Sequence, residues 1–422
     1  MKNLIPSVKG ARDFYPEEKA IHGWLYEKLK GVSTSFGYQE YDGPFLEKID
    51  LYAAKSGEEL VKEQAFVLED RGGDLLALRP ELTPSLARMV AQKQNQLAYP
   101  LRWWSFGPFW RYERPQKGRS REFFQWNIDM IGVDSPESDA ELIAVCVEFF
   151  RGVGLTHNQV AVRVNDRQLM DGELAAIGIT GESKKAAFKL IDRSDKLPLK
   201  EWEDFAAAQG FSVTQIQGIQ AVLNDPDLWR KSPTLPKVFE ALKALQADEF
   251  VRFDAHIIRG LDYYTGTVFE VNDLDGGRAI LGGGRYDNLV EDVGGDPLAG
   301  VGFAMGDVMI TLVLEKYGLL PDIKPFTRAV FVTVFDENSQ DDALRLSAIV
   351  RKAGIEAVCY PAAVKLQKQF KFADRLGVRF VLVQGPDEKA QGSVSVKDLA
   401  DATQRTVAEK DLIQTLQQML TN

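Results

Sequence analysis

The chain has 422 residues, of which 45% are apolar and 27% charged, and its formal net charge is −10. This length predicts two or three domains, and the composition excludes a disordered or fibrous chain. Two cysteines, Cys146 and Cys359, exclude a disulfide framework and a cysteine-rich zinc site. No window approaches the roughly 20 apolar residues of a membrane span, so we expect a cytoplasmic protein without membrane contact. The three histidines lie in unrelated segments, so we do not expect a histidine-based metal site.

The first elements along the chain are a helix and an extended run. Apolar residues at helical spacing predict a long helix over residues 17–36, which Gly37 ends. Residues 38–45 are extended, and Pro44 has no N–H to donate, so this run is typical of an edge or interface strand. Both elements favour a subunit contact, and we therefore expect a homodimer.

Two alternating runs between residues 101 and 130 flank the polar loop 114–122, which predicts a long antiparallel hairpin. Because alternate side chains of a strand face opposite sides, parity divides the hairpin into two surfaces. The even, apolar set is Trp110, Tyr112, Phe124, Trp126, Ile128 and Met130. The odd, polar set is Arg111, Glu113, Phe123, Gln125, Asn127 and Asp129.

The polar face of this hairpin has two interpretations. It is either solvated, as in many half-buried sheets, or a binding surface. Phe123 offers a ring on which a purine stacks, and Arg111 offers two parallel donors to a phosphate. Gln125 and Asp129 continue the face with groups that suit the ammonium of an amino acid. This pattern favours a site that runs from nucleotide to amino acid.

The connecting loop is basic, which indicates either contact with nucleic-acid phosphates or a solvated turn. Downstream, residues 166–248 are predicted to be a helical insertion, after which strand patterns resume at 250–253 and 268–271. The glycines at 282–284 lack the ending of a phosphate-binding loop, so close packing of sheet backbone is the favoured interpretation.

Beyond residue 325 the pattern alternates between strand and helix, with strands expected at 329–335, 356–360 and 379–383. We therefore expect an α+β catalytic domain over residues 1–325, built on an antiparallel sheet with flanking helices. The insertion 166–248 interrupts it, and a C-terminal α/β domain follows over 328–422. In that domain Lys365, Lys368, Lys371 and Arg375 share one face of a predicted helix, which is either a nucleic-acid contact or a solvated face.

The segment from Phe109 to Arg119, continued to Gln125, resembles motif 2 of class II aminoacyl-tRNA synthetases in its histidyl form. Residues 10–13, 79–83, 259–266 and 283–287 resemble the same family, so the resemblance covers nearly the whole chain. It implies ATP-dependent ligation of L-histidine to tRNA(His) through a histidyl-adenylate, with Mg²⁺ and with release of AMP and pyrophosphate. It also implies that the C-terminal domain binds the anticodon.

The resemblance further implies roles for individual residues, among which Arg111 and Arg259 are catalytic at the α-phosphate. The residues implied for ATP are Arg111, Glu113, Arg119, Phe123 and Arg259. Those implied for histidine are Glu81, Leu82, Thr83, Gln125, Asp129, Tyr263, Tyr264 and Tyr286. Those expected for tRNA are Arg114, Gln116, Arg121, Lys365, Lys368 and Lys371.

Three features complicate this assignment. Adjacent tyrosines point to opposite sides of a regular strand, so either the backbone at Tyr263 and Tyr264 is irregular or one of them is structural. Arg259 would equally suit an ion pair at a strand edge. The family's third motif ends in an arginine that meets the γ-phosphate, but Met309 stands in its place, which leaves Arg119 and Arg285 as candidate cations.

The missing arginine keeps an alternative function open. The regulatory subunit of ATP phosphoribosyltransferase in histidine biosynthesis resembles the same catalytic core without being an enzyme, and it commonly lacks the anticodon-binding domain. A sensor module that binds tRNA would need further domains. The retained site residues and the C-terminal domain favour the ligase.

Overall fold

The computed structural model describes residues 4–53, 64–194, 197–258, 263–323, 326 and 329–421. Two compact units are present, one formed by Met1–Asp13 with Trp24–Leu320 and the other by Phe14–Gly23 with Pro321–Asn422. The boundary predicted between residues 325 and 328 falls in a stretch of which residue 326 alone is described. The limits of the insertion, 166 and 248, stay predictions.

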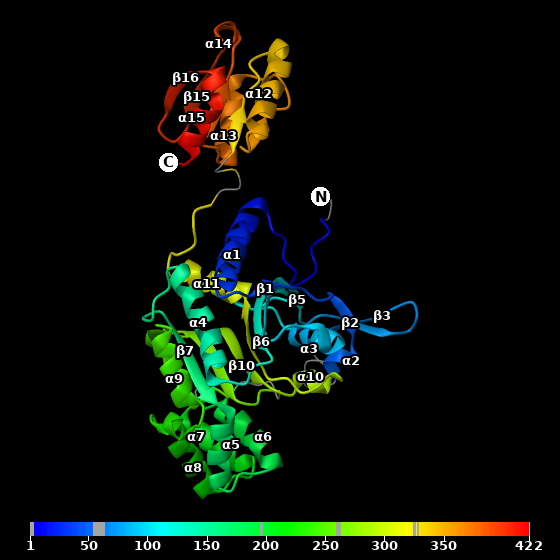
Figure 1. Ribbon diagram of the computed structural model, residues 1–422, viewed down its shortest axis with the longest axis vertical. Helices are drawn as coiled ribbons and strands as arrows, with labels where there is room; N and C mark the ends of the chain where they lie inside the picture. The colour runs from blue at the N-terminus through cyan, green and yellow to red at the C-terminus, as the bar shows by residue number, and fades with distance from the viewer. Residues whose placement is uncertain are drawn as a thin grey trace. The chain divides into compact units, whose positions relative to one another are not determined.

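The first unit is built on an eight-stranded sheet of order β1-β5-β6-β11-β10-β9-β7-β8 (Figure 1). All neighbours pair antiparallel except β1 with β5 and β7 with β8, which confirms the predicted antiparallel sheet. In sheet order the strands are β1 (Gln39–Glu40), β5 (Leu101–Trp110), β6 (Glu122–Ile131), β11 (Gly300–Gly306), β10 (Ala279–Tyr286), β9 (Thr267–Asp273), β7 (Val160–Asp166) and β8 (Val251–Phe253).

Helix α4 (Pro136–Gly152) covers the apolar face of this sheet, where it contacts β6 and β11. It begins where its sequence provides a cap: the Ser135 hydroxyl accepts from the Ser138 N–H at 3.2 Å, and Pro136 occupies the first turn. The core between sheet and helix holds Trp126 and Phe149, whose ring centroids lie 5.4 Å apart. Helices α1 (Pro16–Ser35) and α11 (Asp307–Lys316) add side chains to this core.

The opposite face of the sheet carries a second apolar cluster, with residues from α3 (Thr83–Lys93) and α10 (Leu289–Asp292). A small sheet of order β2-β4-β3 precedes α3; its strands are β2 (Leu46–Lys48), β4 (Leu75–Leu78) and β3 (Phe66–Glu69). The short helices here are α2 (Asp50–Ala53) and η2 (Gln94–Gln96). The predicted strand 38–45 shrinks to β1, which does lie at the sheet edge, while Pro44 lies beyond it.

In the described residues five α-helices stand between β7 and β8, drawn in green (Figure 1). They are α5 (Arg167–Ala176), α6 (Glu182–Ile191), α7 (Leu199–Ala208), α8 (Val213–Leu223) and α9 (Leu235–Ala244), with η3 (Leu228–Lys231) and η4 (Asp248–Phe250). Helices α5 to α8 gather at the lower end of the first unit, whereas the last, α9, lies higher and contacts α4. Gly178 and Gly210 take positive φ values of 76° and 88° just after α5 and α7, as residues that end helices do. The expected helical segment is therefore present.

The second unit holds a five-stranded sheet of order β13-β12-β14-β15-β16. Strands β13, β12 and β14 are parallel, and the other pairs are antiparallel. The strands are β12 (Val330–Val332), β13 (Ala357–Cys359), β14 (Phe380–Val383), β15 (Ser393–Asp398) and β16 (Thr403–Ala408). The helices are α12 (Gln340–Lys352), α13 (Leu366–Leu376), α14 (Pro386–Ala390) and α15 (Leu412–Thr421), with η5 (Glu337–Ser339) and η6 (Glu409–Asp411). Within the described ranges, helices long and apolar enough to cross a membrane are absent.

Candidate active site

The two surfaces predicted for the hairpin are present. Trp126 and Ile128 are fully buried in the core, whereas Phe123 and Gln125 line a cleft on the opposite face of β6. Tyr112 was predicted to pack with the apolar set, and that prediction is wrong because 55% of it is exposed. Strand β5 ends two residues earlier, so alternation no longer determines where this side chain points.

The cleft has a volume of about 270 Å³ and opens between the hairpin loop, β6, β10, β11 and the start of α11. It brings together four of the five residues expected at ATP, and it also includes Gln125. The fifth, Arg259, lies outside the described residues. The lining residues are Arg111, Glu113, Gly118, Arg119, Ser120, Phe123, Gln125, Ala279, Ile280, Leu281, Gly282, Ala304, Gly306, Val308 and Met309.

Arg111 is oriented by the segment that precedes α3. Its Nε donates to the Pro80 carbonyl at 2.9 Å, and its guanidinium carbon lies 5.4 Å from the centroid of the Phe123 ring. The Nε bond uses one of the five N–H donors and fixes the plane of the group. A guanidinium held beside an aromatic ring in this way suits a phosphate that adjoins a stacked base.

A second arginine, Arg119, lines the cleft from the hairpin loop. One of its terminal nitrogens lies 2.8 Å from Glu113 Oε2, and about half of its side chain is exposed. The loop reverses between Gln116 and Arg119, whose backbones exchange hydrogen bonds of 3.1 and 2.8 Å, with Gly118 at a φ of +79°. Among the lining residues, Arg111 and Arg119 carry the positive charge.

Met309 packs against the same loop. A Cβ atom added to Gly118 would lie only 2.4 Å from Met309 Sδ, so the thioether is in contact with the glycine backbone. The residue therefore does line the cleft at the position where the resemblance expects an arginine. In this chain an apolar contact stands there instead of a phosphate-binding cation.

Arg285, the other candidate cation for the γ-phosphate, is excluded by its contacts. It is buried and lies 2.6 Å from the carboxylate of Asp139, which is fully buried. It also donates to the Ser138 hydroxyl at 2.7 Å and to the Ser135 carbonyl at 3.1 Å. Removing it from Asp139 would leave a buried charge unpaired, so Arg285 has a structural role.

Asp129 and Tyr286 form the polar centre of the second cluster, where the Tyr286 hydroxyl donates to Asp129 Oδ1. Both side chains are buried, with exposed fractions of 4% and 3%. Burial raises the pKa of Asp129 to about 7, and the hydrogen bond from Tyr286 acts in the opposite direction. Gly302 stands opposite Asp129 in the next strand, and a Cβ there would overlap the carboxylate. A longer side chain at 129 would need further room.

Both neighbouring tyrosines belong to this cluster. The Tyr263 ring lies 4.9 Å from that of Tyr264 and 6.0 Å from that of Tyr286. Both precede β9, which begins at Thr267, so strand alternation does not separate them. Tyr264 is buried against Gly284, where a Cβ would lie 2.8 Å from its ring. The predicted close packing is present at Gly283 and Gly284, whereas Gly282 lines the cleft.

The remaining residues expected at histidine lie at the start of α3. Glu81 is buried, Leu82 occupies the N-cap position without a side-chain hydrogen bond, and Thr83 is the first residue of the helix. Leu86, one turn later, belongs to the same apolar cluster as Tyr264. The structure thus brings this segment to the face of the sheet that carries the tyrosines.

Two further polar groups lie on this face, Tyr41 and Asn127, and neither was predicted as a site residue. Tyr41 is half-buried, with its hydroxyl oxygen inside the fold, and it packs on Trp103, which pairs with Asp129 across the hairpin. Burial first, and then the charge of Asp129, raise the pKa of the Tyr41 hydroxyl well above its usual value. In the described part of the chain neither this hydroxyl nor the side-chain nitrogen of Asn127 has a hydrogen-bond partner. Parity had placed Asn127 on the polar face, but no motif pointed to Tyr41.

The residues expected at tRNA differ in how they are presented. Arg114 and Gln116 are exposed in the hairpin loop. Arg121 is engaged within the loop, since its guanidinium carbon lies 4.0 Å from the Tyr112 ring centroid and its Nε donates to the Glu113 carbonyl at 3.2 Å. In the second unit the exposed basic residues share one face of α13 and its N-cap: Lys365, Lys368, Lys371 and Arg375.

The polar face of the antiparallel sheet connects an arginine-lined cleft with a buried cluster of an acid and tyrosines. This arrangement defines a class II aminoacyl-tRNA synthetase. A family model described as histidyl-tRNA synthetase matches residues 10–308, and one described as an anticodon binding domain matches residues 329–419. The chain therefore belongs to the histidyl-tRNA synthetase family.

Individual relatives agree with this placement. A histidine–tRNA ligase of Leptospira biflexa is 34% identical over 434 residues, covering 99% of each chain. A chloroplastic and mitochondrial histidine–tRNA ligase of Arabidopsis thaliana is 37% identical over 96% of this chain and 85% of its own. The crystal structure of histidyl-tRNA synthetase from Nostoc superposes with a TM-score of 0.83 at 26% identity, covering 99% of this chain and 100% of that one.

Proposed function

We propose that this chain ligates L-histidine to tRNA(His) in two steps. The histidine carboxylate attacks the α-phosphorus of ATP, the bond to pyrophosphate breaks, and histidyl-adenylate forms. A hydroxyl of the terminal ribose of the tRNA then attacks the histidyl carbonyl, and AMP leaves. The observation that supports this proposal most directly is that odd-numbered residues of one strand, β6, line the cleft at one end and join the Asp129 cluster at the other.

At the cleft end, we propose that adenine stacks on Phe123 and that Arg111 contacts the α-phosphate. Attack of one anion on another depends on charge neutralisation and alignment, which a fixed guanidinium supplies without a protein nucleophile. Arg119, held by Glu113, would meet the outer phosphates. Arg259 is proposed as the second arginine at the α-phosphate.

At the other end, we propose that Asp129 receives the ammonium group of histidine. Its buried carboxylate gains a cationic partner on binding, which favours the ionised form. The unpartnered Tyr41 hydroxyl and Asn127 nitrogen on this face offer hydrogen bonds to a polar ligand. The other side chains proposed to surround histidine are Glu81, Leu82, Thr83, Gln125, Tyr263, Tyr264 and Tyr286.

Mg²⁺ is proposed to enter with the ATP phosphates, and Glu113 is the carboxylate among the residues that line the cleft. When bound, the ion would neutralise charge on the outer phosphates. We propose that Arg114, Gln116 and Arg121 contact the acceptor end of tRNA and that Lys365, Lys368 and Lys371 contact its anticodon arm. The exposed basic face of α13 supports the latter assignment.

We also propose that the enzyme is a cytoplasmic homodimer. Large apolar side chains on the small sheet and just before it are exposed, among them Phe45 (46%), Val67 (46%) and Leu75 (51%). An apolar surface of this kind is typical of a protein interface. Sedimentation as a monomer at micromolar concentration would contradict the dimer.

The decisive experiment is ATP–pyrophosphate exchange with each amino acid in turn, followed by charging of total tRNA. We expect exchange with histidine alone and charging of one tRNA species. Absent or histidine-independent exchange would favour the non-catalytic regulatory role instead. Retention of Arg111, Phe123 and Gln125 around one cleft supports the enzyme.

A further inference from the structure

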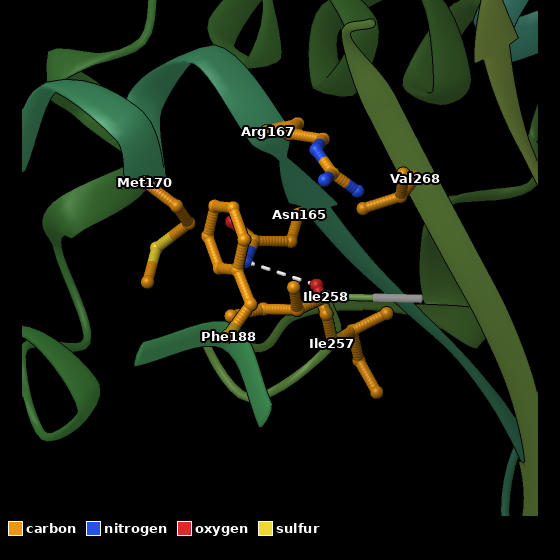
Figure 2. Close-up of a pocket in the computed structure, with 7 residues that line it drawn as sticks. All are labelled: Asn165, Arg167, Met170, Phe188, Ile257, Ile258 and Val268. Atoms are coloured by element: carbon orange, nitrogen blue, oxygen red, sulfur yellow. Dashed lines mark hydrogen bonds between the residues drawn. The ribbon is translucent and has the colours of Figure 1, made fainter. Parts of the chain in front are cut away.

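The junction between β7 and α5, residues 165–168, contacts both flanks of the segment that carries the paired tyrosines. Asn165 is fully buried, and its side-chain nitrogen donates to the Ala255 carbonyl at 3.2 Å and to the Ile257 carbonyl at 3.1 Å. Figure 2 shows the second of these bonds. One amide thus ties down the chain just before residue 259.

The same junction holds the other flank. The Arg167 N–H donates to the Gly266 carbonyl at 3.0 Å, and Gln168 Nε2 donates to the Thr265 carbonyl at 3.1 Å. Tyr263 and Tyr264 stand immediately before these two residues. Three of the four residues of the β7–α5 junction, Asn165, Arg167 and Gln168, therefore bond to backbone on the two sides of one short segment.

Side chains around Asn165 are packed without usable space. Met170, Phe188, Ile257 and Val268 are among the residues that line the gap in Figure 2, which admits no water-sized molecule. Arg167 lies over the Phe188 ring at 4.8 Å. No ligand can therefore bind in this gap. Because the side chains around Asn165 are closely packed, movement of one of them displaces its neighbours.

The junction also anchors the helices of the insertion. Asp166 caps α5 by accepting from the Gln168 N–H at 2.9 Å, and its other oxygen accepts from the Ser232 hydroxyl at 2.5 Å. Ser232 in turn accepts from the Leu235 N–H, the first residue of α9, at 3.1 Å. Two helices of the insertion therefore begin at Asp166, the neighbour of Asn165 in the chain.

We propose that Asn165 and Gln168 are positioning residues for amino-acid activation: they hold both flanks of the segment that presents Tyr263 and Tyr264 to histidine. This inference rests on the proposed function. Neither side chain need touch a substrate, because each acts through the backbone of the segment. Loss of either is expected to raise the histidine KM more than the ATP KM, because the described residues that line the ATP cleft come from other elements. Arg259 lies between the two held flanks in the sequence, so kcat is expected to fall as well.

Two variants of the full chain test this inference. Asn165→Asp keeps the size of the side chain and the oxygen that accepts from the Asp166 N–H at 2.8 Å, but it replaces the donor to two carbonyls by an acceptor. Gln168→Ala removes an exposed side chain together with its hydrogen bond to the Thr265 carbonyl. In pyrophosphate exchange we expect the histidine KM of Asn165→Asp to rise about tenfold, while its ATP KM changes less than about twofold. The histidine KM of Gln168→Ala should rise by a smaller factor.

Gln369 provides the matched control. It too is fully buried and bridges backbone, donating to the Val334 and Val364 carbonyls at 2.7 Å, but it lies in the second unit. Gln369→Ala is expected to lower Tm without changing the histidine KM. If Asn165→Asp lowers Tm but leaves the histidine KM at the wild-type value, the positioning role is wrong.

A second measurement separates this inference from the proposed function. Hydrogen–deuterium exchange of the peptides that span residues 255–266 is expected to accelerate in Asn165→Asp and to stay unchanged in Gln369→Ala. If the wild-type chain shows no histidine-dependent pyrophosphate exchange, the proposed function is wrong. The hydrogen–deuterium exchange of these peptides would still test whether Asn165 holds the segment. If Asn165→Asp leaves the protection of these peptides unchanged, Asn165 does not hold the segment and the positioning role is wrong.

Discussion

The Tyr286 hydroxyl donates a hydrogen bond to the buried carboxylate of Asp129. This bond favours ionised Asp129, while burial opposes ionisation and leaves the pKa of the carboxyl at about 7. In Tyr286→Phe the pKa of Asp129 is therefore expected to rise further. A smaller fraction of Asp129 is then ionised and able to bind the histidine ammonium. The histidine KM should therefore rise by about tenfold or more, which corresponds to the free energy of one hydrogen bond to a charged group.

The control for this variant is Tyr317→Phe, which removes another tyrosine hydroxyl from a carboxylate, Asp273, at 2.8 Å outside the site. Its histidine KM should equal that of wild type. Equal histidine KM values for the two variants in pyrophosphate exchange would refute the role assigned to the Tyr286 bond.

Asp129 also predicts a pH dependence of stability. Because its pKa is about 7 in the folded chain against an ordinary 3.8, the folded state binds this proton more tightly than the unfolded state. Raising the pH between these values therefore destabilises the fold, by up to about 1.4 kcal/mol per pH unit. Asp129→Asn has no carboxyl at this position and so lacks this pH-dependent loss of stability. Between pH 5.5 and pH 7 the Tm of wild type should therefore fall relative to the Tm of the variant. A difference independent of pH would contradict the raised pKa.

Met309→Arg is expected to lower the ATP KM. The present thioether contacts Gly118 in the hairpin loop and lines the same cleft as Arg119. A guanidinium there adds a cation at the end of the cleft proposed for the outer phosphates, where a charge-assisted bond corresponds to about a tenfold change. Met309→Leu, which keeps an apolar side chain of similar volume, is the control and should leave the ATP KM unchanged. A higher ATP KM in Met309→Arg would show that the outer phosphates lie elsewhere.

Charge reversal on α13 should separate the two steps of the reaction. In the triple variant Lys365→Glu, Lys368→Glu and Lys371→Glu, we expect the tRNA KM to rise by at least about tenfold and its dependence on salt to weaken, because phosphate contacts are lost. Histidine-dependent pyrophosphate exchange, which needs no tRNA, should stay at the wild-type rate. The control reverses Lys352 and Lys410, exposed in the same unit but outside α13. Equal tRNA KM values in the two variants would remove α13 from the interface.

Local pattern was sufficient for the hairpin and for much of the second unit. Alternation placed Phe123 and Gln125 on the face opposite Trp126 because a strand repeats every two residues whatever its partners. The same rule misplaced Tyr112, which lies past the end of β5, and it raised a conflict at Tyr263 and Tyr264 that does not exist, since neither is in a strand. Periodicity is informative only where the regular element continues.

By itself, the sequence determined the elements, the polar face of β6 and the missing arginine at Met309, because these depend on residue type and spacing along the chain. Only the tertiary structure decided which cations remain available: Arg285 is bound to Asp139, while Arg119 lines the cleft. It also decided that Asp129 meets Tyr286 and that Asn165 holds a segment some ninety residues away. Burial and contacts between distant segments set pKa values and orientations, and neither is encoded in local spacing.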